Sequence, residues 1–156
     1  MTYEDNYNDI HNTYYFYLAK KTIEIPAGSY VYYGVDVTPN KDAILNIDIS
    51  NANAKSDYDW QKNDWDDVNW RQTDVSENGE LVKSGVDLRN PVSLKANHTY
   101  HISIKYRNTN DFSIYDSPVN NSGMTTSLMF APVNGVKIGN NINILSKNYK
   151  VNVVHF

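Results

Sequence analysis

The residues best suited to ligand binding lie close together in one acidic segment of the chain. All three tryptophans, Trp60, Trp65 and Trp70, recur there every five residues, and each follows an Asp or an Asn. A strand repeats every two residues and a helix about every 3.6, so this spacing fits neither and predicts an irregular loop that leads into a strand. Indole rings beside carboxylates can bind a sugar, because the ring packs on the C–H face of a pyranose while the carboxylates accept hydrogen bonds from its hydroxyl groups.

Two interpretations of this segment remain open. In the first, it forms a saccharide-binding surface on which aromatic rings stack and polar side chains bind hydroxyl groups. In the second, the segment folds back and its tryptophans close one end of the core, because Trp is usually well buried whatever its role. The ligand-binding residues expected in the first case are Tyr58, Asp59, Trp60, Asp64, Trp65, Trp70 and Arg71.

The carboxylates of the same segment could also hold calcium, which takes roughly six to eight oxygen ligands. The residues from Asp57 to Asn63 partly match the start of an EF-hand loop, but Lys62 stands where that motif needs glycine and Val68 where it needs glutamate. We therefore expect no EF-hand. An irregular calcium site stays open beside the alternative of a solvated acidic loop, and no cofactor is required. The candidate calcium ligands are Asp57, Asp59, Asp66 and Asp67.

No motif in the sequence predicts a catalytic centre. The four histidines, His11, His98, His101 and His155, lie in no metal-binding or triad-like pattern. The sequence has no G-x-S-x-G, no H-E-x-x-H and no glycine-rich phosphate loop. Cysteine is absent, which excludes disulfides and thiolate zinc sites. We therefore expect a protein that is not an enzyme.

Composition limits the class of partner. The 156 residues carry a net charge of −4 and no run of Lys or Arg, so we expect no nucleic-acid binding. No apolar run approaches the ~20 residues that a membrane-spanning helix needs, so we expect no membrane insertion. Residues 1–12 are polar and predict an N-terminal arm or linker, and residues 13–156 predict a single β-domain.

Short β-type runs between turn residues predict an all-β fold. Ile44–Ser50 and Thr99–Tyr106 alternate between apolar and polar residues, which predicts one buried and one solvent-exposed face. No long stretch has helical periodicity. Many short strands at even spacing favour a jelly-roll-like sandwich of two antiparallel sheets. The other expected strands are 14–18, 22–25, 30–37, 92–94, 111–115 and a closing meander of 124–130, 133–138, 142–145 and 149–156.

A hairpin is predicted at Asn78-Gly79, which favours a two-residue type I′ turn. Centring the strands on this turn places Val75 opposite Val82 on one face and Asp74 opposite Lys83 on the other. If the two valines face the core, Trp70 lies on the polar face. A bulge would shift this register by one residue.

The segment from Leu94 to Tyr106 resembles a recurring segment of non-catalytic carbohydrate-binding modules. In those modules a leucine precedes a small polar turn, and a strand with the pattern of Tyr100, Ile102, Ser103 and Ile104 follows. The resemblance implies a jelly-roll sandwich that binds glycans through exposed Trp and Tyr and often carries a structural calcium. It transfers no binding residue by position.

The Asn-rich, Tyr-rich and Cys-free composition also resembles modules of phage baseplates and tails that adhere to the cell-wall polysaccharide of Gram-positive bacteria. The leading interpretation is therefore non-catalytic adhesion to a bacterial surface polysaccharide, on a virion tail or at a cell surface. The alternative is a structural or protein-docking module whose exposed aromatic side chains contact other subunits of an assembly. The acidic segment disfavours a heavily anionic glycan unless calcium bridges it, although Arg71 could donate to a phosphate.

Overall fold

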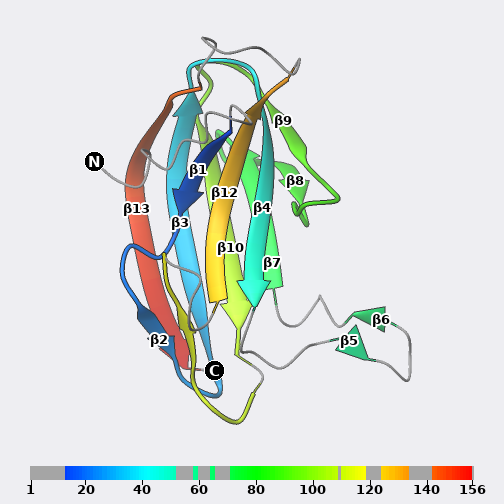
Figure 1. The fold of residues 1–156 in the computed structure, drawn as a ribbon. Helices are drawn as coiled ribbons and strands as arrows, with labels where there is room; N and C mark the ends of the chain where they lie inside the picture. Colours follow the sequence, from blue (N-terminus) through cyan, green and yellow to red (C-terminus); the bar gives the residue numbers. More distant parts are fainter. Residues whose placement is uncertain are drawn as a thin grey trace.

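The computed structural model describes residues 13–51, 58–59, 64–65, 71–108, 110–118, 124–133 and 142–155, and the regular elements among them are all β-strands. Two sheets pack face to face (Figure 1). One sheet contains β1 (Tyr14–Tyr17), β2 (Ile23–Ile25), β4 (Ala43–Asn51), β9 (Val92–Leu94), β11 (Ile114–Asp116) and β12 (Met124–Pro132). The other contains β3 (Ser29–Pro39), β7 (Arg71–Glu77), β8 (Glu80–Ser84), β10 (Tyr100–Arg107) and β13 (Ile144–His155). A separate two-stranded ladder joins β5 (Tyr58–Asp59) to β6 (Asp64–Trp65).

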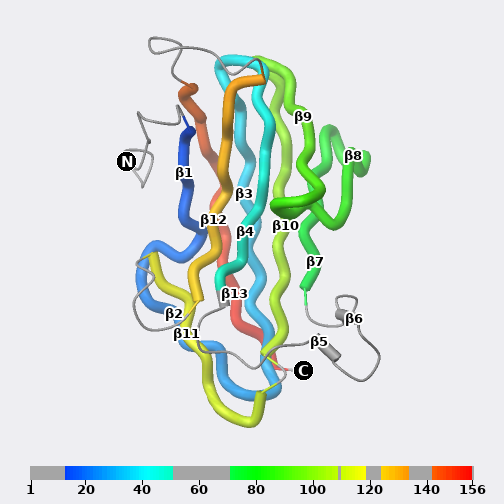
Figure 2. The backbone as a smooth tube through the Cα atoms, turned by 45° about the vertical axis from the view of Figure 1, so that its right-hand side comes forward, coloured from blue at the N-terminus to red at the C-terminus, as the bar shows by residue number. Residues whose placement is uncertain are grey.

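The strand order defines a jelly roll. The first sheet runs β2-β11-β12-β4-β9, with β1 also paired to β12, and the second runs β13-β3-β10-β7-β8. The chain crosses to the opposite sheet from β2 to β3, β3 to β4, β4 to β7, β8 to β9, β9 to β10, β10 to β11 and β12 to β13, and stays in one sheet from β1 to β2, β7 to β8 and β11 to β12 (Figure 2). This is jelly-roll connectivity with β13 as an additional strand beside β3. The pairings are antiparallel except for one parallel pair, Asp116 with Met124, so the expected fold class is confirmed.

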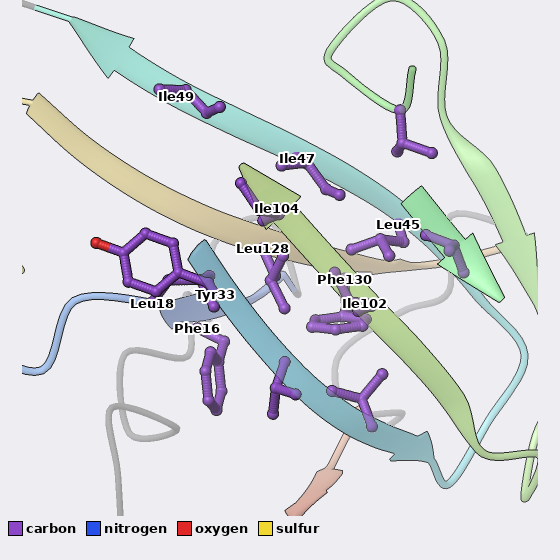
Figure 3. Close-up of a cluster of buried hydrophobic side chains, with 14 of the residues drawn as sticks. Phe16, Leu18, Tyr33, Leu45, Ile47, Ile49, Ile102, Ile104, Leu128 and Phe130 are labelled. Carbon is purple, nitrogen blue, oxygen red and sulfur yellow. The ribbon is translucent and has the colours of Figure 1, made fainter. Parts of the chain in front are cut away.

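The core fills the space between the two sheets. In β10, Ile102 and Ile104 are fully buried while the residues between them face solvent. Leu45 and Ile47 of β4 approach them from the opposite sheet, and Phe130 of β12 closes the layer (Figure 3). The clean alternation in the sequence predicts this inward set correctly. Each such side chain contributes roughly 1.5–3 kcal/mol by leaving water.

The end of the chain departs from the expected meander. β12 pairs with β4 in one sheet, whereas β13 pairs with β3 in the other, so these strands are not neighbours. The separate strands expected at 142–145 and 149–156 are one strand, whose register shifts between Lys147 and Lys150. This irregularity lets Tyr149 pack against the core and donate its hydroxyl to the Leu18 carbonyl. Residues 134–140 lie outside the described residues, so the strand expected at 133–138 is largely untested.

The hairpin turn is confirmed, but the expected strand register is only partly right. Asn78 and Gly79 have φ values of 53° and 80°, as a type I′ turn requires. A bulge follows, so Lys83 and not Val82 lies opposite Val75. Val75 is buried, whereas Val82 is 44% exposed. A one-residue insertion cannot be read from alternation alone, because both registers keep Val75 inside.

One acidic side chain, Asp116, is fully buried between the sheets. Its Oδ2 accepts hydrogen bonds from the hydroxyl groups of Tyr33 and Thr126, and its Oδ1 has no hydrogen-bond partner. Burial raises the pKa of Asp116 to about 6, although these hydroxyls and the backbone N–H groups of Thr126 and Ser117 favour the ionised form. Burial and this carboxylate also raise the pKa of Tyr149 to about 12.

Candidate functional site

The described residues place a pair of adjoining pockets at the beginning of β7. The larger pocket, about 340 Å³, is lined by β7 and by the segment that follows β8. The smaller, about 140 Å³, also reaches Ile47 and Asp48 of β4, and both pockets share Arg71 and Asp87. β4 ends and β7 begins at the same end of the sandwich (Figure 1). Arg71, the first residue of β7, directly follows in sequence the segment that carries the tryptophans. We call the two pockets together the Arg71 pocket.

Arg71 and Asp87 form the polar centre of the Arg71 pocket. A guanidinium nitrogen of Arg71 lies 3.3 Å from Oδ2 of Asp87, and both side chains are largely buried. The backbone N–H of Arg89 donates to Oδ1 of Asp87 at 2.8 Å, so both carboxylate oxygens are held. A guanidinium group is a donor only, and its planar N–H groups suit hydroxyl or phosphate oxygens.

The segment from Ser84 to Pro91 is held in place by short-range bonds. The Asn90 side-chain amide donates to the Gly85 carbonyl at 2.9 Å, and the backbones of Asp87 and Asn90 pair with each other. Val86 is buried, and its backbone N–H donates to the Thr73 carbonyl of β7. This wall of the pocket is therefore formed before any ligand arrives, which reduces the entropy lost on binding.

Asp48 contributes a second carboxylate to the smaller pocket. Burial raises its pKa, and the nearby Arg71 guanidinium opposes that shift. On the larger pocket, Gln72, Asp74 and Ser84 make no side-chain hydrogen bond to any described residue. Their donors and acceptors are free for water or for a ligand. The chemistry is that of a polyol site, in which carboxylate, amide and hydroxyl groups bind neighbouring hydroxyls.

Thr73 joins β7 to the segment from Ser84 to Pro91, which forms a wall of the pocket. Its hydroxyl is buried and donates to the Val86 carbonyl at 2.7 Å. The isosteric change Thr73→Val should lower the free energy of unfolding by about 1–2 kcal/mol, because the carbonyl loses its partner in a buried place. Thr38→Val, at an exposed threonine pair with Thr99, should change it by less than about 0.5 kcal/mol. Equal effects of the two variants in chemical denaturation would contradict this attachment.

The structure describes only part of the predicted site. Arg71 lines the pocket, and its role as a ligand contact stays a prediction. Tyr58 pairs with Trp65 and Asp59 pairs with Asp64 in the β5–β6 ladder, so these four residues come together in one short hairpin within the segment predicted as a loop. The remaining predicted residues, Asp57, Trp60, Asp66, Asp67 and Trp70, lie outside the described residues. Their roles in binding a ligand or calcium stay predictions.

Four charged pocket residues, Asp48, Asp74, Asp87 and Arg89, were missed from the sequence. Asp48 alternates with core residues, which predicts only an ordinary wet-face carboxylate. Asp87 and Arg89 lie just before Asn90-Pro91, where the sequence signals a chain break but gives no reason to expect a site. Only the crossing from β8 back to the opposite sheet brings Asp87 against Arg71. A cluster of charged residues before a turn would have been the one available signal.

No protein-family model, no curated protein and no solved structure matches this chain. The described residues contain no helix long and apolar enough to cross a membrane, and no group of three or more His, Asp or Glu side chains that could hold a metal. The Arg71 pocket is therefore judged on its own geometry.

Proposed function

We propose that this chain is a non-catalytic carbohydrate-binding module that attaches a larger assembly, such as a phage tail or a surface protein, to a bacterial cell-surface polysaccharide. The observation that carries the proposal is the Arg71 pocket, a polar pocket lined by Arg71, which directly follows the Trp-bearing segment in sequence. Fold alone would not support a function, because jelly rolls serve many.

The proposed division of labour follows from the chemistry of a sugar. Trp60, Trp65 and Trp70 would stack on the apolar faces of pyranose rings, and Arg71 would bind hydroxyl groups together with neighbouring carboxylates. Calcium could be held by the acidic residues of the same segment. A single shallow site of this kind binds weakly, and several copies in one assembly would strengthen attachment through avidity.

Asp74 offers a direct test because it lines the pocket and its side chain makes no hydrogen bond to another described residue. Asp74→Asn should weaken glycan binding roughly tenfold or more, since a hydrogen bond to a charged group is replaced by a neutral one. The melting temperature should not change. Asp111→Asn, at an exposed loop residue elsewhere, is the matched control and should leave binding intact. Unchanged binding in the Asp74 variant would remove the Arg71 pocket from the site.

The proposal also holds that bound polysaccharide is recovered at its original chain length. Release of new reducing ends during incubation would overturn the non-catalytic part of it.

A protein-docking function is the second candidate, and the apolar rim of the pocket favours it. Leu88 lines the smaller pocket and is 55% exposed. Exposed apolar side chains around a pocket are common at protein interfaces. If the pocket docks a protein, Leu88→Ser should abolish attachment to the other subunits. If the pocket binds a glycan, the same change should leave glycan binding unchanged. Pull-down with the assembly and glycan titration of the same variant separate the two functions.

A further inference from the structure

The outer face of the five-stranded sheet carries a row of four short residues and a final lysine, and the row begins at the Arg71 pocket. The register aligns Ser84 with Asp74, Asp74 with Ser103, and Ser103 with Gly34, and Lys150 ends the row on β13. The row therefore crosses all five strands, and its four interstrand steps span about 19 Å. We call these five residues the Gly34 row.

Longer side chains border the Gly34 row on both sides. Tyr32, which is 40% exposed, and Lys105 are directly paired on one side. Asp36 and His101 are paired on the other, where their side chains are joined at 2.7 Å between Oδ1 and Nδ1. Ser103 makes no side-chain hydrogen bond to any described residue. An extended molecule that crosses the strands would lie along the Gly34 row, between these longer side chains.

The backbone gives no reason for a glycine at position 34. Its φ is not in the left-handed region, and an added Cβ would first meet the His101 ring at 3.5 Å, an ordinary contact. Glycine inside a strand lowers stability, and often marks a place where a ligand approaches the sheet closely. The missing side chain leaves the backbone of β3 open on the outer face.

The same face is cationic although the chain has a net charge of −4. Its outward positions on β3, β7, β10 and β13 carry four cationic side chains and two carboxylates, which are Lys105, Arg107, Lys147, Lys150, Asp36 and Asp74. Asp36 is already occupied: Asn148 donates to its Oδ2 at 2.7 Å, and His101 contacts its Oδ1. The Asn148 bond is the main reason that the pKa of Asp36 is lowered. The net attraction of this face is therefore for an anion.

We propose that the outer face binds an anionic polysaccharide chain that crosses the strands along the Gly34 row. Its carboxylate or phosphodiester groups would lie at Lys105 and Lys150, and its neutral sugars would extend to the Arg71 pocket. This inference rests on the proposed function and names the class of its glycan. The acidic Trp-bearing segment by itself disfavours an anionic glycan. The sequence does not reveal the cationic face, because that face forms only when four separate strands come into register.

The test measures binding of three polysaccharides at low and high salt. The probes are polygalacturonate, which bears carboxylates, a wall teichoic acid with phosphodiester links, and neutral dextran. At least one polyanion should bind more tightly than dextran and should weaken as salt rises, because exposed charges are screened. The two polyanions show which acidic group is preferred. Monomeric galacturonate should bind much more weakly than the polymer, because it occupies only part of the row.

Three variants locate the chain on the sheet. Lys150→Gln should weaken polyanion binding about two- to fivefold, as expected for one exposed charge, and the control Lys95→Gln in the turn before β10 should not. Gly34→Ala should weaken it about tenfold or more, because one methyl group blocks close approach. The melting temperature of Gly34→Ala should be unchanged or slightly higher, which separates lost binding from lost folding.

Each negative outcome has a distinct meaning. If dextran binds as tightly as the polyanions, or if Gly34→Ala and Lys150→Gln bind like the native protein, the inference is wrong while glycan binding stands. If a single-stranded oligonucleotide binds equally well along the same residues, the face selects charge and not saccharide, and the inference also fails. If no polysaccharide binds at all, the proposed function fails with it.

Discussion

Raising the pH from about 4 to about 7.5 should lower the free energy of unfolding of the native protein by about 2 kcal/mol relative to the Asp116→Asn variant. Asp116 has an ordinary pKa of 3.8 in the unfolded chain and about 6 in the folded protein. The folded state therefore binds this proton more tightly. The stability contributed by the protonated group is fully present below pH 3.8 and is lost as the pH rises through about 6.

The Asn variant isolates this effect because it has no charge to bury. Its side-chain oxygen can still accept the hydroxyl bonds of Tyr33 and Thr126. Chemical denaturation at several pH values would give the two stability curves. Asp36→Asn is the control: the pKa of Asp36 is lowered, so that change affects stability below the ordinary pKa of 3.8 and not near 6. Parallel curves for the native and Asp116→Asn proteins would show that the buried carboxyl group titrates normally.

Trp65→Ala should abolish glycan binding and leave the melting temperature almost unchanged. The reason is the proposed role of Trp65 as a stacking surface for a pyranose ring. Removing an aromatic platform takes away both contact area and the orientation of the sugar ring. Calorimetry on the variant, with and without polysaccharide, measures both quantities in one preparation.

The opposite pattern would support the interpretation in which the tryptophans close the core. Truncation of a buried Trp lowers the free energy of unfolding by about 3–5 kcal/mol. Phe130→Ala provides the reference for such a loss, because Phe130 is fully buried in the described core. A Trp65 variant as unstable as the Phe130 variant would identify a structural residue.

Alternating strands were the most predictable part of the fold. Ile44–Ser50 and Thr99–Tyr106 carry a strict two-residue period; the first lies within β4, and the second lies within β10 except for Thr99. The Asn78-Gly79 turn was also predictable, since few residues other than Asn and Gly accept its φ values. These features depend on neighbours in the sequence, and local chemistry is sufficient to specify them.

Features that depend on distant pairing were not predictable. The bulge at Val82 and the irregularity in β13 insert residues without changing the pattern of apolar side chains enough to reveal them. The ion pair of Arg71 with Asp87 depends on the course of the segment after β8. The cationic outer face requires the register of four strands. The alternation of apolar and polar residues is compatible with several strand registers. A single sequence does not show which of these registers the folded protein adopts.

The most direct test of carbohydrate binding is a titration of intrinsic Trp fluorescence with bacterial cell-wall polysaccharides, in calcium and again in EDTA. The proposed function predicts a saturable spectral shift, because all three tryptophans lie in the segment assigned to the glycan. Loss of the shift in EDTA would add calcium to the site. A spectrum that stays unshifted at every polysaccharide concentration, with or without calcium, would contradict the proposed function.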